Sequence, residues 1–352
     1  RKAMKAMALY LPAFHRIPEN DRWWGEGFTE WENTKKGRPL YKGHNQPLIP
    51  SHNNYYDLTD VNTLKWQAAI ARKYHISGFI LYHYWFNGKR LLEKPVELFL
   101  EHKEIDIEFC LCWANESWAR TWDGKDTEIL MKQVYGEEEE WERHFQYYLP
   151  FFLDRRYVKN SGRPVLFIYS LGKIKRYDDM VQYWNRRAVE EGLNGIYLVE
   201  MINTFNPKKM GVHTSAVCEF EPHSTCRNSV AAPVKLKRVI CKKAGLTDYL
   251  DYDYVWERLL RKNTTYGGCP VIRSAFVNFD NSPRKGRKSF VIKGATPRKF
   301  SHYLHLLMRS GRKNLSPDYL VINAWNEWGE GAVLEPTEHD KFGYLEAVRN
   351  NL

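Results

Sequence analysis

The chain has 352 residues, of which 43% are hydrophobic and 27% are charged, a composition typical of a folded globular protein. This length is large for an ordinary domain but usual for an α/β barrel with insertions, so we expect one domain over residues 1–352. No stretch approaches the roughly 18 consecutive apolar residues of a membrane-spanning helix, and we expect no such helix here.

The formal net charge is +11, and basic residues gather in the stretches 35–42, 155–163, 235–243 and 284–299. Such a charge fits an acidic glycan, a lipid-linked glycan on a phosphate carrier, or peripheral association with an anionic membrane; an ordinary solvated surface is the alternative. No nucleic-acid-binding module or basic helix is expected with it, so nucleic acid is not a predicted partner. The sequence predicts no oligomeric state.

The six cysteines form no C-x-x-C pair and have no histidine at metal-ligand spacing, so we expect no metal and no cofactor. Cys110 and Cys112 lie in an apolar run and are interpreted as core residues. Free thiols favour a cytoplasmic location. The chain begins at Arg1 without an initiator Met or signal peptide, so a trimmed N-terminus would leave a periplasmic or extracellular location open.

Eight short apolar runs are typical of buried parallel strands. They cover residues 7–11, 78–82, 109–113, 165–169, 196–200, 216–220, 271–276 and 319–324. Helical patterns alternate with them at 61–74, 91–103, 137–153, 177–191, near Lys208, and at 254–262, 297–310 and 343–349. This alternation predicts a (β/α)8 barrel with long loop insertions after strands 1 and 6. The second insertion, 221–268, shows no clear strand and is interpreted as a lid or a partner surface.

The first insertion, residues 12–60, is dense in Trp, Tyr, Asn, Gly and His. A connection this long is usually functional, and in a barrel it would lie over the catalytic end. We therefore predict ligand contacts from Tyr10 at the end of the first strand and from Trp24, Glu30 and Trp31 in the insertion. Aromatic rings pack on the C–H faces of sugars, so the 15% aromatic content suits a glycan cleft, although aromatic core packing explains part of it.

Polar and aromatic residues also follow the second and third strands. After the second we predict ligand contacts from His83, Tyr84 and Trp85, with a structural role for the histidine as the alternative. After the third the candidates are Trp113, Asn115, Glu116 and Trp118. Glu116 either binds sugar hydroxyls or braces a loop by pairing with Arg120 at helical spacing. Asp280 and Arg284, after the seventh strand, complete this group of candidates.

The last predicted strand ends in two carboxylates, Glu327 and Glu330, set among glycines. Two carboxylates so placed can flank one glycosidic bond, where one protonates the leaving oxygen and the other activates the attacking group. Trp325 and Trp328 would raise the pKa of one carboxyl by desolvation, and Asn326 would hydrogen-bond the charged form of the other. A solvated turn at a strand end is the alternative.

The segment 326–331, continuing to Glu335 and Pro336, resembles the Asn-Glu-Trp-x-Glu-Gly segment of glycoside hydrolase family 99, the endo-α-mannosidase and endo-α-mannanase group. The whole chain resembles more closely the WbsX-like branch known among surface-polysaccharide biosynthesis proteins. Further motifs carry this resemblance: 10–15 (YLPAFH), 23–31 (WWGEGFTEW), 82–86 (YHYWF), 112–118 (CWANESW) and 280–284 (DNSPR). The resemblance implies a single catalytic barrel that cleaves an α-linked mannan-like or bacterial surface polysaccharide with retention.

By position, the resemblance implies that Glu327 deprotonates the sugar 2-hydroxyl and that Glu330 acts as acid and then base. A glycosyltransferase or transglycosylase in O-antigen or capsule assembly is the second interpretation. Its common metal-dependent form needs an Asp-x-Asp site, and Asp251-Tyr252-Asp253 has that form, but its place before a helix favours N-capping. A non-catalytic glycan-binding protein ranks last because both carboxylates are present.

Overall fold

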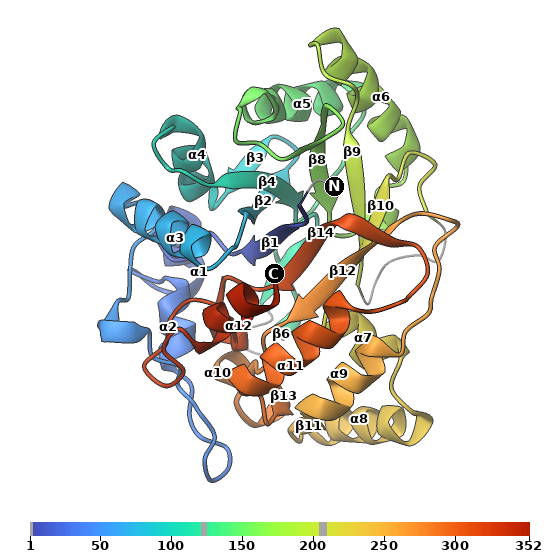
Figure 1. The fold of residues 1–352 in the computed structure, drawn as a ribbon. Helices are drawn as coiled ribbons and strands as arrows, with labels where there is room; N and C mark the ends of the chain where they lie inside the picture. The colour runs from blue at the N-terminus through green and yellow to red at the C-terminus, as the bar shows by residue number, and fades with distance from the viewer. Residues whose placement is uncertain (1–2, 121–124, 204–209) are drawn as a thin grey trace.

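The structure, a computed structural model, describes residues 3–120, 125–203 and 210–352. Its centre is a ring of parallel strands in the order β1-β14-β12-β10-β9-β8-β4-β2, which the β1–β2 pairing closes (Figure 1). They are β1 (Lys5–Tyr10), β2 (Gly78–Phe86), β4 (Glu108–Trp113), β8 (Arg163–Ile168), β9 (Tyr197–Ile202), β10 (Ala216–Glu219), β12 (Val271–Phe276) and β14 (Leu315–Asn323). Each overlaps a predicted run, so the predicted (β/α)8 barrel is confirmed.

Helices surround this ring, as Figure 1 shows. Those that match predicted helical patterns are α3 (Val61–Lys73), α4 (Glu93–Glu101), α5 (Glu138–Leu153), α6 (Tyr177–Glu190), α9 (Tyr252–Leu260), α11 (Pro297–Met308) and α12 (Gly343–Asn351). The predicted helix near Lys208 lies outside the described residues. The side chains of Asp60, Asp251 and Thr296 each accept a hydrogen bond from a first-turn backbone N–H, which fixes where α3, α9 and α11 begin.

The barrel strands are buried on both faces, as parallel strands covered by helices are. Leu320, Val321 and Ile322 of β14 are all buried, which explains why this strand reads as a continuous apolar run. Cys110 and Cys112 of β4 are buried as well, which confirms their interpretation as core residues. Polar side chains that could contact a ligand are therefore expected at the strand ends.

Both insertions contain folded elements. The first carries α1 (Pro18–Trp24), α2 (Glu30–Lys35) and the 3-10 turn η1 (Ser51–Asn53). The second carries α7 (His223–Asn228), α8 (Ala232–Ala244) and β11 (Asp248–Asp251), which pairs in parallel with β13 (Phe290–Lys293). The expectation of no strand in 221–268 is thus wrong, because a four-residue strand whose partner lies far along the chain gives no readable pattern. The expectation of no basic helix is also wrong, since 235–243 lies in α8.

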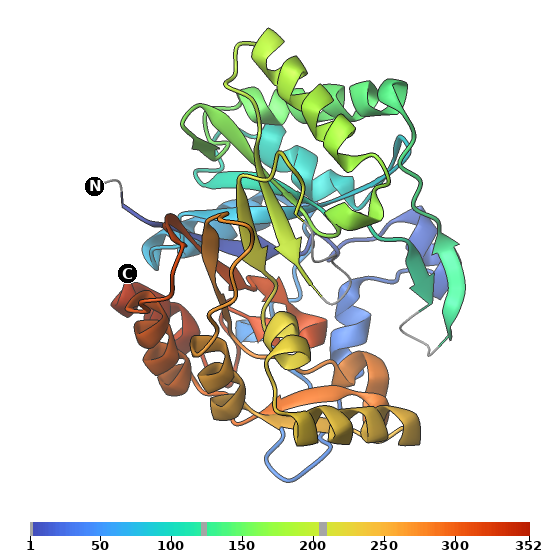
Figure 2. The same ribbon diagram turned by 90° about the vertical axis from the view of Figure 1, so that its right-hand side faces the viewer.

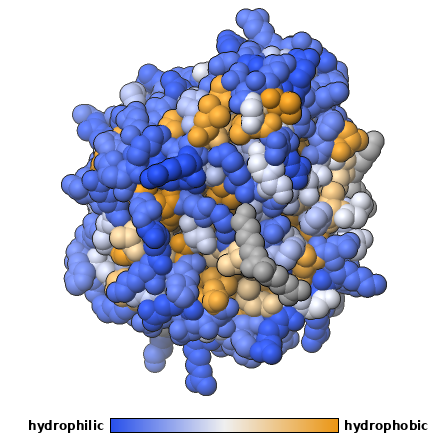
Figure 3. Space-filling view, turned by 45° about the horizontal axis from the view of Figure 1, so that its top comes forward, coloured by the Kyte–Doolittle hydropathy of each residue, from blue (hydrophilic) through white to orange (hydrophobic). Residues whose placement is uncertain are grey.

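Several short helices and strands lie near the ends of the barrel strands. They are β3 (Lys89–Leu91), β5 (Trp118–Arg120), β6 (Lys125–Met131), β7 (Lys159–Asn160), η3 (Leu171–Lys173), α10 (Ser282–Lys285), η4 (Gly286–Lys288), β15 (Asn326–Glu327), η5 (Trp328–Glu330) and β16 (Ala332–Val333). Figure 2 shows both chain termini on one side of the molecule, away from α8. The face drawn in Figure 3 is mostly hydrophilic. No helix within the described ranges is long and apolar enough to cross a membrane.

Candidate active site

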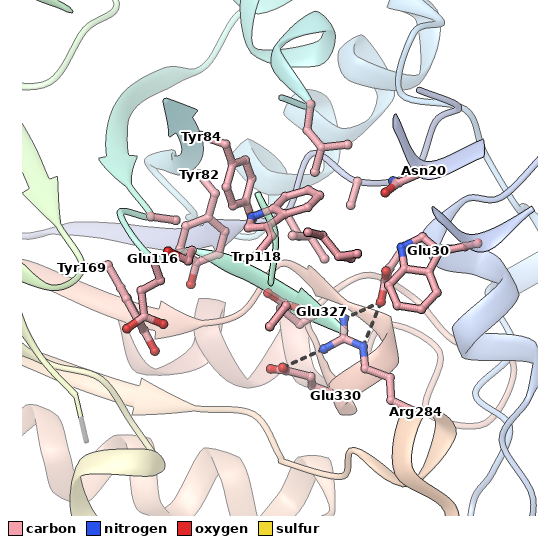
Figure 4. A pocket seen from close by; sticks show the side chains of 18 of the residues that line it. Asn20, Glu30, Tyr82, Tyr84, Glu116, Trp118, Tyr169, Arg284, Glu327 and Glu330 are labelled. Atoms are coloured by element: carbon pink, nitrogen blue, oxygen red, sulfur yellow. Dashed lines mark hydrogen bonds and ion pairs between the residues drawn. The ribbon is translucent and has the colours of Figure 1, made fainter. Parts of the chain in front are cut away.

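A pocket of about 350 Å³ lies at the carboxyl ends of the barrel strands (Figure 4), where barrel enzymes place their active sites. It is lined by Leu11, Ala13, Asn20, Trp24, Glu30, Tyr82, Tyr84, Leu92, Ala114, Glu116, Ser117, Trp118, Ala119, Leu130, Tyr169, Phe220, His223, Arg284, Glu327 and Glu330. The lining therefore combines aromatic rings with carboxylates and one guanidinium group.

The predicted site residues fall into two groups. Those that line the pocket are Trp24, Glu30, Tyr84, Glu116, Trp118, Arg284, Glu327 and Glu330. Those that do not line it are Tyr10, Trp31, His83, Trp85, Trp113, Asn115, Asp280, Trp325, Asn326 and Trp328. Both carboxylates of the predicted catalytic pair therefore face one cavity, whereas most of the predicted aromatic contacts lie behind its wall.

The alternation of β2 explains one part of this division. His83 and Trp85 point toward α5: the His83 Nε2 lies 2.8 Å from the His144 Nε2, and Trp85 stacks on His144 with ring centroids 4.4 Å apart. Tyr82 and Tyr84 point the other way and line the pocket. Successive side chains of a strand face opposite sides. A pocket contact from Tyr84 therefore predicts one from Tyr82 as well, and argues against contacts from His83 and Trp85.

Two asparagines instead bind backbone groups. The Asn326 side chain accepts a hydrogen bond from the Leu11 N–H at 2.7 Å and donates to the Leu11 carbonyl at 3.0 Å. Asn115 forms the same pair of bonds with Ser170, at 2.7 and 2.8 Å. Each amide thereby joins the end of one strand to a neighbouring segment. Asn326 is directed at Leu11 and not at the two carboxylates, contrary to expectation.

The remaining predicted aromatic residues contact other side chains or the backbone and not the pocket. Trp31 packs against Trp328, with ring centroids 5.3 Å apart. The Trp328 Nε1–H donates to the Glu335 carboxylate at 3.1 Å. The Tyr10 hydroxyl donates to Gln67 at 2.6 Å. Trp325 packs on Phe79, and Trp113 donates to the backbone carbonyl of Trp85. These contacts place the five aromatic side chains outside the lining of the pocket.

Arg284 joins three segments that the sequence separates widely (Figure 4). Its guanidinium group donates to the Glu330 carboxylate at 2.8 Å and, through Nε, to the Glu30 carboxylate at 3.0 Å. Burial lowers the pKa of Arg284, but the carboxylates of Glu30 and Glu330 outweigh that effect and raise it, so the guanidinium stays charged. Arg284 therefore links α2 and α10 to the turn that carries the predicted catalytic pair.

Gly329, between the two carboxylates, is required by this close packing. A Cβ at this position would lie 2.9 Å from the Arg284 Nε and 2.9 Å from the Glu30 Oε1. A side chain here would separate the ion pair or displace the turn. The glycine in the Glu-Trp-Gly-Glu motif thus has a direct steric cause.

Glu327 and Glu330 occupy different environments. Glu327 is only 7% exposed, and within the described part of the chain its Oε2 atom has no hydrogen-bond partner. Burial and the charge of Glu330 raise its pKa well above the usual value, and Arg284 offsets this only in part. Burial and the nearby Glu330 therefore favour the protonated form of Glu327, while Glu330 forms an ion pair with Arg284.

Asp280 supports this turn from outside the pocket. Its backbone N–H donates to the Glu330 carbonyl at 2.6 Å, and its carboxylate accepts hydrogen bonds from His44 and Gln46 at 2.6 and 3.0 Å. The Leu40 N–H donates to the His44 Nδ1, so the His44 Nε2 carries the proton. Burial raises the pKa of Asp280, but the hydrogen bonds from His44 and Ser282 outweigh it and lower the pKa.

Other polar groups line the remaining walls. Burial raises the pKa values of Tyr82 and Tyr84, so both hydroxyls remain protonated hydrogen-bond donors. Glu116 accepts hydrogen bonds from Ser170 at 3.1 Å and from Lys173 at 2.7 Å. The predicted helical brace to Arg120 does not form, because Trp118–Arg120 is strand β5.

Tyr169 and His223 are among the lining residues that the sequence analysis missed. Tyr169 directly follows β8, so its place at a strand end was a readable signal. His223 follows the cis bond between Glu221 and Pro222 and stacks on Phe220 with ring centroids 4.8 Å apart. Burial lowers the pKa of His223 and favours the neutral ring. No sequence pattern pointed to it. Among the described residues, no group of three or more His, Cys, Asp or Glu side chains is placed to hold a metal ion.

The family model described as "Glycosyltransferase WbsX" matches residues 6–348. The chain belongs to the WbsX family. The chain is 34% and 33% identical to two proteins named "Uncharacterized protein WxcX", from two strains of Xanthomonas campestris pv. campestris; each match covers 98% of this chain. The chain spans about half of these relatives, 49% of each.

Solved structures support the barrel fold of this WbsX family member. A "Glycoside hydrolase-like protein" aligns with a TM-score of 0.60 and 11% identity, over 100% of this chain and 94% of that one. A GH99 endo-alpha-mannosidase from Bacteroides thetaiotaomicron aligns with a TM-score of 0.58 and 13% identity, over 98% and 95% of the two chains. At such identity the likeness shows the fold alone. The family description, which names a glycosyltransferase, supports a carbohydrate-active enzyme.

Proposed function

We propose that this protein cleaves an α-linked polysaccharide, mannan-like or from a bacterial surface, by retaining glycoside hydrolysis with Glu327 and Glu330. The observation that carries the proposal is the unequal environment of these two carboxyls in one pocket. Glu327 is buried with an unpartnered oxygen, and Glu330 is paired with Arg284. A glycosidase needs one protonated and one ionised carboxyl on either side of the scissile bond.

The rest of the pocket suits a sugar. Trp24, Trp118 and the tyrosines at 82, 84 and 169 provide aromatic faces for C–H groups, and Glu116 is placed to accept from hydroxyls. The volume of about 350 Å³ is at the lower end of the range for ligand sites. We propose that the predicted contacts lining the pocket bind the substrate directly. The predicted contacts behind its wall position the lining residues.

The order of roles is a separate question. The resemblance to family 99 implies that Glu327 takes a proton from the sugar 2-hydroxyl and that Glu330 protonates the leaving oxygen. In the free pocket the surroundings favour the proton on Glu327, so this order requires a proton to pass from Glu327 to Glu330 before reaction. A substrate hydroxyl that donates to the unpartnered Glu327 Oε2 would favour this loss, because hydrogen bonds to a carboxylate lower its pKa.

Transfer to an acceptor sugar is the second candidate, because the family description names a glycosyltransferase. The same carboxyl pair would then activate an acceptor hydroxyl in place of water. A metal-dependent nucleotide-sugar site at the Asp251-Tyr252-Asp253 segment is disfavoured. Asp251 caps α9 by accepting from the Tyr254 N–H at 3.0 Å, as expected, and Asp253 binds Lys299 and Tyr303.

The test is product release by the purified protein from a panel of α-linked mannans and bacterial surface polysaccharides. Glu327→Gln and Glu330→Gln should each abolish release, and NMR of the first product should show the retained anomer. A substrate with an activated leaving group then separates the roles: the variant of the acid residue should regain most of its rate, and the variant of the base should not. Sugar transfer from a nucleotide or lipid-linked donor, without any hydrolysis, would replace the hydrolase proposal.

A further inference from the structure

Helix α8 shows an unusual distribution of side chains. None of its residues is buried, although it has 13 residues and three turns. Only one side faces the protein, where Val234 packs against the core, Arg238 binds Asp248 at 2.6 Å and the Lys237 ammonium reaches the Tyr249 carbonyl. Figure 2 shows α8 at the edge of the molecule, with its other side toward solvent.

The outward side of α8 carries large apolar residues. Leu236, Val239 and Ile240 are 63%, 50% and 54% exposed, and their i, i+3, i+4 spacing places them on one face. Leu246, just after the helix, is 58% exposed. A surface helix normally turns its apolar face to the core and its polar face to solvent. The exposed apolar row of Leu236, Val239 and Ile240 is therefore typical of a surface that binds a partner.

The charges around this row have one sign. Residues 232–244 contain five basic side chains and no acidic one, and no Asp or Glu occurs between Glu221 and Asp248. Lys235, Lys242 and Lys243 are exposed. Exposed Arg287 and Lys288 lie beside the end of α8, because the Thr247 hydroxyl donates to the Arg287 carbonyl at 2.7 Å.

We propose that α8 docks the protein on an anionic lipid bilayer, with Leu236, Val239 and Ile240 entering the interface and the flanking cations contacting lipid phosphates. An exposed apolar row flanked by lysines is the pattern of helices that lie in a membrane interface. A second copy of this chain fits poorly, because two such helices would bring together cations without counter-charges. The inference does not depend on which reaction the pocket performs.

Docking through α8 would also orient the pocket. The helix follows β10, so it lies at the same end of the barrel as the pocket. A protein docked in this way holds its pocket on the side of the molecule that faces the bilayer. Glycans attached to that membrane would then be presented to the pocket.

The experiment is flotation of the whole protein with two kinds of vesicle, phosphatidylcholine alone and phosphatidylcholine with 30% phosphatidylglycerol. Wild-type protein should float only with the anionic vesicles and should be released by 0.5 M NaCl. Lys242→Gln/Lys243→Gln should weaken binding about 25-fold, about fivefold for each lysine. Leu236→Ser/Ile240→Ser should weaken it about tenfold or more, because less apolar surface is buried.

Matched controls use the opposite end of the barrel. Lys73→Gln/Lys313→Gln makes the same charge change just before β2 and β14, and Leu153→Ser/Val189→Ser removes similarly exposed apolar groups. Both controls should bind like wild type, and all variants should keep the wild-type Tm. Equal loss in controls and α8 variants, or no wild-type flotation, would overturn the proposal. A dimer that only the α8 variants dissociate would assign this face to a second copy and overturn it too.

Discussion

Replacing Arg284 by Met tests whether the guanidinium group holds the pocket together. Glu30 is 1% exposed, and among the described residues the hydrogen bonds that its carboxylate would keep without Arg284 are those from the Asn33 amide, at 3.3 and 3.4 Å. A buried charge that loses its partner typically costs about 3–5 kcal/mol. We expect the free energy of unfolding to fall by about that amount, with a smaller share from Glu330, whose side chain is 23% exposed.

A double-mutant cycle in urea, followed by Trp fluorescence, separates this cause from lost packing. Arg284→Met/Glu30→Gln removes both charges, so it should regain about 2 kcal/mol relative to Arg284→Met. Lys341→Met is the matched control, because it breaks an ion pair with Glu338 whose side chains are 64% and 41% exposed, and it should cost under about 1 kcal/mol. An Arg284→Met cost as small as the control's, or no recovery in the double variant, would refute the reasoning.

Three further predictions concern single residues. Burial raises the pKa of Glu335 to about 7, above its usual 4.5, so the folded protein keeps a proton there that the unfolded chain releases. As the pH rises from 4.5 to 7, the free energy of unfolding of the wild type, measured in urea, should fall by up to about 3 kcal/mol, whereas that of Glu335→Gln should not. Parallel pH profiles of the two proteins would contradict this. Gly329→Ala should lower kcat at least about tenfold by displacing Arg284, whereas Gly311→Ala, with open space around it, should not; equal kcat values would show that the turn tolerates a Cβ. Trp118→Ala should raise KM by up to about tenfold through lost ring contact with sugar, while Trp184→Phe, behind the wall, leaves KM unchanged; an unaltered KM in Trp118→Ala would place the sugar elsewhere.

The fold could be predicted from the sequence because each barrel strand is a local signal. A parallel strand buried on both faces is a continuous apolar run, and β14 shows this over Leu320, Val321 and Ile322. The helices that cover the barrel have their own period, and caps such as Asp251 mark where they begin. In contrast, α8 and β11 were missed. An uncovered helix has no core-facing stripe, and a short strand depends on a partner remote in the sequence.

The sequence by itself determined that Glu327 and Glu330 would lie together at a strand end, since neighbours in a chain stay neighbours in space. It did not determine which aromatic and amide side chains face the pocket. That depends on whether each side chain points from its strand or turn toward the pocket or away from it. Asn326 has the residue type of a ligand contact, yet its amide is used by the Leu11 backbone. Only the tertiary structure brought Glu30 and Arg284 beside Glu330, across 254 and 46 residues of chain. The unequal environments of the two carboxyls follow from that packing, because pKa values depend on burial and on charges that are close in space.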